Sequence, residues 1–204
     1  KQIIIIDDGS NDGTTEKLKK IKKSLKIDKI IFCKKNQGKG HAIKLGQKAV
    51  KEKYTIIQDA DLEYNPKDYH KILKVLEKKK YKVVYGSRML NTNHFAKNNF
   101  TSNIRLFANH VLTITSNIIN SQNLTDAHTC YKVFKSNLFK QLDLEERGFA
   151  FCPEVTTKLS NMNYQIKEVP ISYNGRDYKD GKKIKLKDAV EAIIVLLKYK
   201  FFKK

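Results

Sequence analysis

The chain has 204 residues, of which 40% are hydrophobic and 10% aromatic, and this is enough to bury one core and form one domain. Its 41 Lys and Arg against 21 Asp and Glu leave a net charge of +20, which excludes a neutral structural module and indicates an anionic partner, substrate or surface. Three widely separated cysteines without a CxxC pair argue against a zinc knuckle or a disulfide framework and favour the reducing cytoplasm. Because no apolar run approaches the ~20 residues of a membrane span, we expect a soluble or membrane-peripheral protein.

The first 90 residues alternate short β-branched runs with segments of helical period. This rhythm is typical of an α/β fold, in which parallel strands are joined by crossover helices. Strands are predicted at Ile3–Ile6, Ile30–Cys33, Tyr54–Gln58 and Tyr81–Tyr85. Helices are predicted around Leu18–Leu25, over Ala42–Lys51, and after Pro66, where Ile72, Leu73 and Leu76 form an apolar face.

After residue 90 the pattern is less regular. Helical spacing recurs over Ile104–Ile119 and Pro153–Leu159, and Tyr164–Tyr173 alternates as a strand does. The last segment, 186–204, is a basic amphipathic helix with a stripe of Leu186, Ala189, Val190, Ile193, Ile194 and Leu197. Two interpretations remain open: the stripe packs on the sheet, or it rests on an anionic lipid surface.

Charged residues follow three of the predicted strands. These are Asp7-Asp8, Asp59-Ala60-Asp61 and Gly86-Ser87-Arg88. In an open α/β sheet ligands bind beyond the carboxyl ends of the strands, so we expect these residues to share one edge. Two carboxylates one residue apart can hold a hard cation and leave positions for phosphate oxygens; Asp59 and Asp61 are therefore predicted to bind Mg²⁺ or Mn²⁺, with Glu63 as a possible third ligand.

Two polar loops have structural as well as functional interpretations. A carboxylate in the turn 7–14 could accept bonds from a nucleobase or ribose, while Asp12 or Thr14 could cap a helix. The loop 36–40 lacks the spacing of a P-loop or a dinucleotide fingerprint, and Lys39 within it could approach a diphosphate.

Asp126 is a candidate base or acceptor-orienting carboxylate, or a cap for the loop before Thr129.

Several motifs follow one another in a fixed order: Asp7-Asp-Gly-Ser, Asn36-x-Gly-Lys-Gly-x-Ala42, Asp59-Ala-Asp-Leu-Glu63, Gly86-Ser-Arg88, Asp126-x-x-Thr-Cys-Tyr-Lys132 and Glu168-Val-Pro-Ile-Ser-Tyr173. Together they resemble the family 2 glycosyltransferases of the GT-A fold, and especially the enzymes that transfer a sugar to polyprenyl or dolichyl phosphate, such as the dolichol-phosphate mannosyltransferases. The stretch 174–184 strengthens the lipid-phosphate branch. The resemblance spans roughly residues 3–200 and implies a mostly parallel central sheet flanked by helices.

The resemblance also implies roles for individual residues. Contacts to the nucleotide sugar are expected from Asp7, Asp8, Gly38, Lys39 and Asp59. The metal ligands would be Asp59, Asp61 and Glu63. The catalytic group would comprise Asp61, Asp126 and Arg88, with Arg88 near the phosphate beside the transferring sugar. The acceptor phosphate would be bound by Arg105, Arg176, Lys182 and Lys183. Residues 1–90 would form the nucleotide-sugar-binding half and residues 91–185 the acceptor half of a single domain.

The reaction expected from these residues is transfer of a hexose from a nucleotide diphosphate sugar to a lipid monophosphate, with inversion at the anomeric carbon. The cation would offset charge on the departing diphosphate. A phosphate monoester is already largely dianionic at neutral pH, so a general base contributes less than it would for a sugar hydroxyl. Because the net charge of +20 would attract the enzyme to the anionic leaflet in which the lipid phosphate lies, we expect it to lie peripherally on the cytoplasmic face of a membrane.

Other functions fit the sequence less well. A nucleic-acid-binding module would cluster Arg and Lys among aromatic residues, whereas here 37 of the 41 basic residues are Lys and they are scattered, so no nucleic-acid partner is expected. A sugar nucleotidyltransferase would need a Gly-rich first loop. The stronger alternative is a family 2 enzyme that uses a saccharide acceptor in cell-surface polysaccharide synthesis. Relatives open with a strand ending in a Pro-x-Tyr-Asn-Glu loop that is absent here, so an N-terminally truncated domain is expected.

Overall fold

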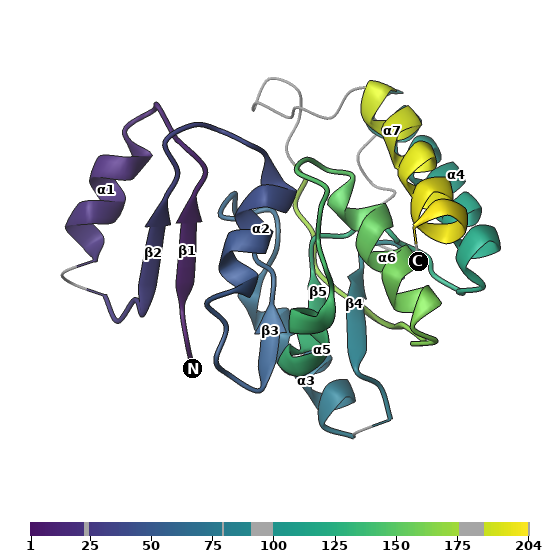
Figure 1. The fold of residues 1–204 in the computed structure, drawn as a ribbon, viewed down its shortest axis with the longest axis horizontal. Helices are drawn as coiled ribbons and strands as arrows, with labels where there is room; N and C mark the ends of the chain where they lie inside the picture. The colour runs from purple at the N-terminus through teal and green to yellow at the C-terminus, as the bar shows by residue number, and fades with distance from the viewer. Residues whose placement is uncertain (23–24, 79, 91–99, 176–185, 204) are drawn as a thin grey trace.

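The computed structural model describes residues 1–22, 25–78, 80–90, 100–175 and 186–203 (Figure 1). The first half alternates strands and helices as the sequence predicts. Its elements are β1 (Ile4–Asp7), α1 (Thr14–Ile21), β2 (Lys29–Phe32), α2 (Lys39–Gln47), β3 (Tyr54–Ile56), the short 3₁₀ turn η1 (Pro66–Asp68), α3 (Tyr69–Glu77) and β4 (Val83–Ser87). Local chemistry fixes several boundaries: the Asn65 side chain accepts a bond from the Lys67 amide, and Pro66 begins η1 with φ suited to a first turn.

The second half contains more helix than strand. Its elements are α4 (Phe100–Asn120), β5 (Lys132–Lys135), α5 (Ser136–Gln141), α6 (Phe151–Asn161), β6 (Lys167–Pro170), α7 (Leu186–Leu197) and the π-helical turn η4 (Lys198–Phe202). The helices predicted at 104–119, 153–159 and 186–204 are confirmed. β5 and α5 were not predicted.

The strands form two sheets. β1 and β2 pair in parallel, and a second sheet has the order β3-β5-β4-β6. In that sheet β4 and β6 are parallel, whereas β5 runs antiparallel to both β3 and β4. The α/β fold is therefore as expected; the larger sheet is mixed, with β3, β4 and β6 running in one direction and β5 in the other. β5 is reversed because the chain reaches it at the edge where β3 and β4 end, and it enters the sheet from that edge.

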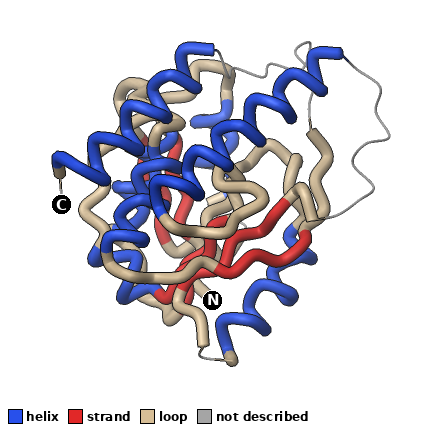
Figure 2. The backbone as a smooth tube through the Cα atoms, turned by 90° about the vertical axis from the view of Figure 1, so that its right-hand side faces the viewer, coloured by secondary structure: helices blue, strands red, loops and turns tan. Residues whose placement is uncertain are grey.

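Two hydrophobic clusters cover the two faces of the four-stranded sheet. Alternation along β5 places Phe134 in one cluster with α5 and α6, and Val133 in the other with α3. α6 lies between the sheet and the pair α4 and α7, which are in contact (Figure 1). α4 and α7 form the side of the molecule that faces the viewer in Figure 2. β1 and β2 point toward the upper edge of the sheets in Figure 1. The loops that follow the strands, which carry the charged residues, lie at this edge.

The C-terminal helix packs through the face opposite to the predicted stripe. Ala192, Val195, Leu196 and Tyr199 are buried, whereas four members of the stripe, Val190, Ile193, Ile194 and Leu197, are exposed. The interpretation in which the stripe packs on the sheet is thus wrong. Helix α4 also carries an exposed apolar row at helical spacing: Phe107, Val111, Ile114 and Ile118. Among the described residues, no helix is both long and apolar enough to cross a bilayer.

Candidate active site

An ion pair connects the loop after β3 with the start of α2. Lys39 is the first residue of α2, and its Nζ lies 2.7 Å from Asp59 Oδ2. The same ammonium lies 3.0 Å from the sulfur of Cys130, which comes from the loop before β5. Burial alone would lower the pKa of Lys39, but Cys130 and Asp59 beside it outweigh burial and raise this pKa above its ordinary value. Asp59, predicted as a metal ligand, is thus already paired with a cation that stays charged.

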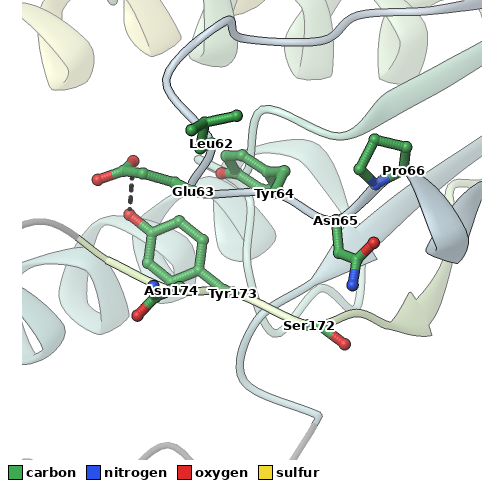
Figure 3. A pocket seen from close by; sticks show the side chains of 8 residues that line it. All are labelled: Leu62, Glu63, Tyr64, Asn65, Pro66, Ser172, Tyr173 and Asn174. Carbon is green, nitrogen blue, oxygen red and sulfur yellow. Dashed lines mark hydrogen bonds between the residues drawn. The ribbon is translucent and has the colours of Figure 1, made fainter.

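The remaining carboxylates of this loop have different partners. Asp61 Oδ1 accepts a bond from the Glu63 amide at 3.2 Å, across Leu62, which has a left-handed φ of 62°. The Glu63 carboxylate is directed at Tyr173 and accepts a bond from its hydroxyl at 2.9 Å (Figure 3). Residues 62–66 and 172–174 line an open pocket here, held by an antiparallel bridge between Tyr64 and Tyr173. The loop is therefore fastened to the segment that follows β6.

The residues present fit a divalent cation in part. Asp59 and Asp61 supply the hard oxygen ligands that Mg²⁺ and Mn²⁺ take, and the Lys39 ammonium at Asp59 marks a position where positive charge is stabilised. In the part of the chain that the structure describes, however, no three His, Cys, Asp or Glu side chains lie close enough together to hold a metal. The predicted set of Asp59, Asp61 and Glu63 is thus not assembled, because Glu63 is directed at Tyr173.

A second ion pair lies at the end of β4. Arg88 contacts the fully buried Asp126 through two parallel bonds, Nε to Oδ2 at 2.6 Å and Nη2 to Oδ1 at 2.7 Å. The Arg88 amide and Asn109 Nδ2 donate to the same carboxylate. Burial acts to raise the pKa of Asp126, but Arg88 outweighs burial and holds it below the ordinary value. Both oxygens are occupied, so this geometry favours Asp126 as the group that orients Arg88 over Asp126 as a base.

The backbone around Asp126 is fixed from β6. Glu168 accepts bonds from the amides of Thr125 and Asp126 at 2.7 and 2.9 Å. The guanidinium of Arg88 also lies 5.1 Å from the ring centre of Tyr173, the residue that binds Glu63. Tyr173 therefore stands between the acidic loop and the Arg88–Asp126 pair. The sequence motifs include Glu168, Tyr173 and Cys130, but the sequence alone predicted no role for any of the three.

The two carboxylates of the first polar turn, Asp7 and Asp8, accept hydrogen bonds from groups of the protein itself. Asp7 is buried and accepts bonds from the Ser10 amide and the Thr15 hydroxyl; burial opposes the effect of these bonds, but they outweigh it and lower the pKa of Asp7. The Asp8 carboxylate accepts bonds from the amides of Gln37 and Gly38. Gly38 has a φ of 94°, and a Cβ there would lie 2.6 Å from the Arg147 carbonyl oxygen. Asp8 thus shapes the loop that presents Lys39.

The residues predicted to bind the acceptor phosphate lie wholly or partly outside the part of the chain that the structure describes. Arg105 lies in α4, about one helical turn before Asn109, the residue that binds Asp126, but its side chain is outside the described part of the structure. Arg176, Lys182 and Lys183 lie outside the described residues altogether. Their roles stay predictions. The described part of the site therefore consists of the acidic loop, Lys39, and the Arg88–Asp126 pair, all at the edge of the sheet where β3 and β4 end.

Comparison with known proteins gives the family. Residues 1–143 match the family described as Glycosyl transferase family 2. The chain belongs to this glycosyltransferase family. It is 29% identical over 187 residues to a dolichyl-phosphate beta-glucosyltransferase of Dictyostelium discoideum, covering 86% of this chain and 56% of the relative. Identity to the enzyme of the same name from Saccharomyces cerevisiae is also 29%, covering 97% of this chain and 65% of the relative. The chain thus spans less than two thirds of these curated relatives.

Solved structures agree on the fold. Glucosyl-3-phosphoglycerate synthase from Mycobacterium tuberculosis, in complex with Mn²⁺ and uridine-diphosphate-glucose, superimposes with a TM-score of 0.65 over 97% of this chain and 67% of that chain, at 12% identity. Another structure of this synthase gives a TM-score of 0.66 over 97% of this chain and 68% of that chain, at the same identity. These similarities confirm the predicted GT-A fold of this family 2 glycosyltransferase.

Proposed function

We propose that this family 2 glycosyltransferase transfers a hexose from a nucleotide diphosphate sugar of the GDP-mannose or UDP-glucose type to a polyprenyl or dolichyl phosphate, with inversion at the anomeric carbon. The observation that carries the proposal is the arrangement at one sheet edge of an acidic loop, a lysine that already neutralises it, and an arginine oriented by a buried carboxylate. The relatives named as dolichyl-phosphate glucosyltransferases support a lipid-phosphate acceptor.

The donor diphosphate would be bound between the acidic loop and α2. A divalent cation held by Asp59 and Asp61 would act as a Lewis acid that offsets charge on the departing diphosphate. The M. tuberculosis synthase that shares the fold was solved with Mn²⁺ and uridine-diphosphate-glucose, which supports this choice of metal and donor class. Lys39, which now donates to Asp59, would donate to a phosphate oxygen of the donor if Asp59 held a cation instead.

Arg88 would stabilise negative charge on the other side of the sugar. Two of its nitrogens are used by Asp126, so the guanidinium is held in one orientation before any substrate binds. Such preorganised charge stabilises a transition state without reorganising when the reaction occurs. Attack by a dianionic lipid phosphate requires no protein base, and this agrees with an Asp126 carboxylate whose two oxygens already accept bonds.

The side of the molecule formed by α4 and α7 would face the lipid. Exposed apolar side chains on the two touching helices lie at helical spacing, among them Phe107 and Ile118 on α4 and Ile194 on α7, with exposures of 69%, 75% and 59%. Phe201 and Phe202 continue the surface in η4. Apolar side chains of this kind insert at a membrane interface, and the net charge of +20 favours anionic lipids. We call this surface the α4–α7 face.

The basic residues at the end of the chain contribute less charge to this face than their number indicates. Lys198 pairs with Glu146 at 2.7 Å, and Lys203 pairs with Glu145. Attraction to anionic lipid would therefore come from the wider lysine surplus. The three cysteines are free, which agrees with a reducing compartment and with a peripheral position on the cytoplasmic face of a membrane.

The test is a transfer assay with the full-length gene product. Radiolabelled GDP-mannose and UDP-glucose are supplied separately with Mg²⁺ or Mn²⁺ and polyprenyl phosphate, and label is measured in the organic phase after extraction. We expect lipid-extractable label with one donor, and a loss of about 10²–10³-fold in Asp61→Asn, the size of effect seen when one charge-stabilising group is removed. Label that appears only on an added oligosaccharide would contradict the lipid acceptor, and full activity of Asp61→Asn would contradict the metal site.

A further inference from the structure

Lys132 is a buried cation that the proposed reaction does not use. It is the first residue of β5, and its side chain is fully inaccessible to solvent. Its ammonium donates to the carbonyl oxygens of Ala127 at 2.9 Å and Thr129 at 2.7 Å, and lies 4.0 Å from the ring centre of Tyr85. Among the described residues no carboxylate forms an ion pair with it. Burial lowers the pKa of Lys132 despite the attraction of the nearby Asp126 carboxylate, and the two carbonyls and the ring are the groups in contact with its ammonium.

The two carbonyls belong to the loop 126–130, which joins the two ion pairs of the site. Asp126 begins this loop and orients Arg88. Cys130 ends it, with its sulfur 3.0 Å from Lys39 Nζ. The main chain of Lys132 extends the connection, since its carbonyl oxygen accepts a bond from the Ile57 amide, two residues before Asp59. Lys132 thus contacts the loop 126–130, strand β4 through Tyr85, and the residue that follows β3.

The loop is fastened at its two ends by the side chains of Asp126 and Cys130, but less so in its middle. Of the buried side-chain atoms that lack a hydrogen-bond partner in the described residues, two are His128 Nε2 and Thr129 Oγ1, both within this loop. Burial, together with the charge of Lys132, lowers the pKa of His128 to about 4, so its ring is neutral and supplies no charge to the loop near neutral pH. The carbonyls of Ala127 and Thr129 are instead gathered by the Lys132 ammonium.

We propose that Lys132 is a positioning residue of the active site, whose buried ammonium holds the loop 126–130 so that Asp126 keeps Arg88 oriented and Cys130 keeps its contact with Lys39. This inference rests on the proposed function, because the two pairs matter only if they bind the donor and acceptor. Removing the ammonium leaves two buried carbonyls without a donor, and the loop opens locally to reach water.

The protein contains its own reporter for this opening. Cys130 is buried at the end of the loop, whereas Cys152 is buried in helix α6, which is outside the loop although the thiol lies near enough to Lys132 to act on its charge. Reaction of each thiol with a maleimide, followed by peptide mass spectrometry, measures the two sites separately and needs no substrate. The Lys132→Met variant removes the charge but keeps the length of the chain. Lys82→Met is the matched control, because Lys82 also lies over a tyrosine ring, that of Tyr164, but next to the opposite end of β4.

In Lys132→Met we expect Cys130 to be modified at least about tenfold faster than in the wild type, with Cys152 unchanged, as local opening without global unfolding requires. Transfer should fall with a decrease in kcat larger than the increase in the KM of the donor, since misplaced groups act mainly on the reacting geometry. Lys82→Met should leave both properties as in the wild type. Lys132→Arg, which keeps the charge and the donors, should keep Cys130 protected.

Three outcomes would overturn the proposal. The first is a Cys130 that stays as protected in Lys132→Met as in the wild type. The second is equal acceleration at Cys130 and Cys152 in both Lys132 variants, which would give Lys132 a purely global role in stability. The third is an opened loop with unchanged kcat. A wild-type protein that transfers no hexose would instead contradict the proposed function, while the thiol measurements would still report whether Lys132 holds the loop.

Discussion

The two ion pairs of the site are built differently. Arg88 and Asp126 are joined by two parallel bonds around a fully buried carboxylate, with an amide and Asn109 as further donors. Lys39 and Asp59 share a single bond; the two cations, Arg88 and Lys39, are equally exposed at 21%, but Asp59 is 29% exposed whereas Asp126 is fully buried. The first pair is fixed by its surroundings, whereas the second can exchange one cation for another. The comparison teaches that the charge on the proposed acceptor side is preorganised, and that the charge on the proposed donor side is replaceable.

The difference predicts unequal effects on stability. Asp126→Asn leaves the mostly covered Arg88 guanidinium, 21% exposed, without its carboxylate partner and should lower the free energy of unfolding by about 3–5 kcal/mol. Asp59→Asn removes a partly exposed pair and should cost less than about 1 kcal/mol. Urea denaturation followed by circular dichroism measures both. Equal losses in the two variants would contradict the distinction between a fixed and an exchangeable pair.

The fixed pair adjoins the proposed lipid surface, since α4 carries both Asn109, which binds Asp126, and the exposed Phe107. Replacing Phe107 and Phe201 together with serine should weaken binding to vesicles that contain anionic lipid by about tenfold or more, because both rings lose their place in the interface. Vesicle flotation measures the bound fraction. Phe32→Ser serves as control, because Phe32 is an exposed phenylalanine on β2. Unchanged flotation of the double variant would exclude the α4–α7 face.

Replacing Lys39 of the exchangeable pair should have opposite effects on two ligands: Mn²⁺ binding by the free protein should become tighter, and nucleotide-sugar binding should become weaker. Lys39→Met removes the cation that competes at Asp59, so the free protein should bind Mn²⁺ about two- to fivefold more tightly, as expected for loss of a partly exposed pair. With the donor present, the same variant should bind the nucleotide sugar more weakly, because a phosphate contact is lost. Electron paramagnetic resonance measures free Mn²⁺ in both titrations. Weaker Mn²⁺ binding without donor would contradict competition at Asp59.

The Arg88–Asp126 pair also predicts a smaller effect, a decrease of the melting temperature at acidic pH. Arg88 holds the pKa of Asp126 below the ordinary value of 3.8, so the stabilisation by this pair is complete above about pH 4 and is lost as the pH falls through the lowered pKa. Melting temperatures recorded between pH 5 and pH 2.5 should therefore decline in acid. The decline should be shallower in Asp126→Asn, and an identical slope would show that Asp126 does not contribute.

Sequence patterns located most of the fold because its strands and helices are locally marked. The run of isoleucines in β1, and Tyr81–Tyr85 before Gly86, have the period and the breakers that define strands. β5 escaped prediction because it is short and begins with Lys132, which has the composition of a surface position although it is fully buried. The stripe on α7 was identified correctly as apolar, but only packing against α4 and α6 decides which face is covered.

The site was harder to derive than the fold. The strand-end rule correctly indicated that Asp59 and Arg88 follow strands, but it could not show what each carboxylate binds. Asp8 contacts an amide 29 residues away and Asp126 contacts Arg88 across 38 residues, and such long-range partners leave no local signal. Cys130 stood in a sequence motif without a role, because its neighbour, Lys39, is 91 residues distant. Spacing therefore identified candidate groups, while their pairing required the fold.

The most direct test of the central claim is a crystal structure of the protein with Mn²⁺ and a nucleotide sugar, in which anomalous scattering locates the metal. We predict a manganese ion within about 2.0–2.4 Å of oxygens from both Asp59 and Asp61, with Lys39 Nζ moved from Asp59 to the diphosphate. A manganese ion bound elsewhere, or a bound donor with Lys39 still paired to Asp59 and either aspartate directed away from the diphosphate, would contradict it.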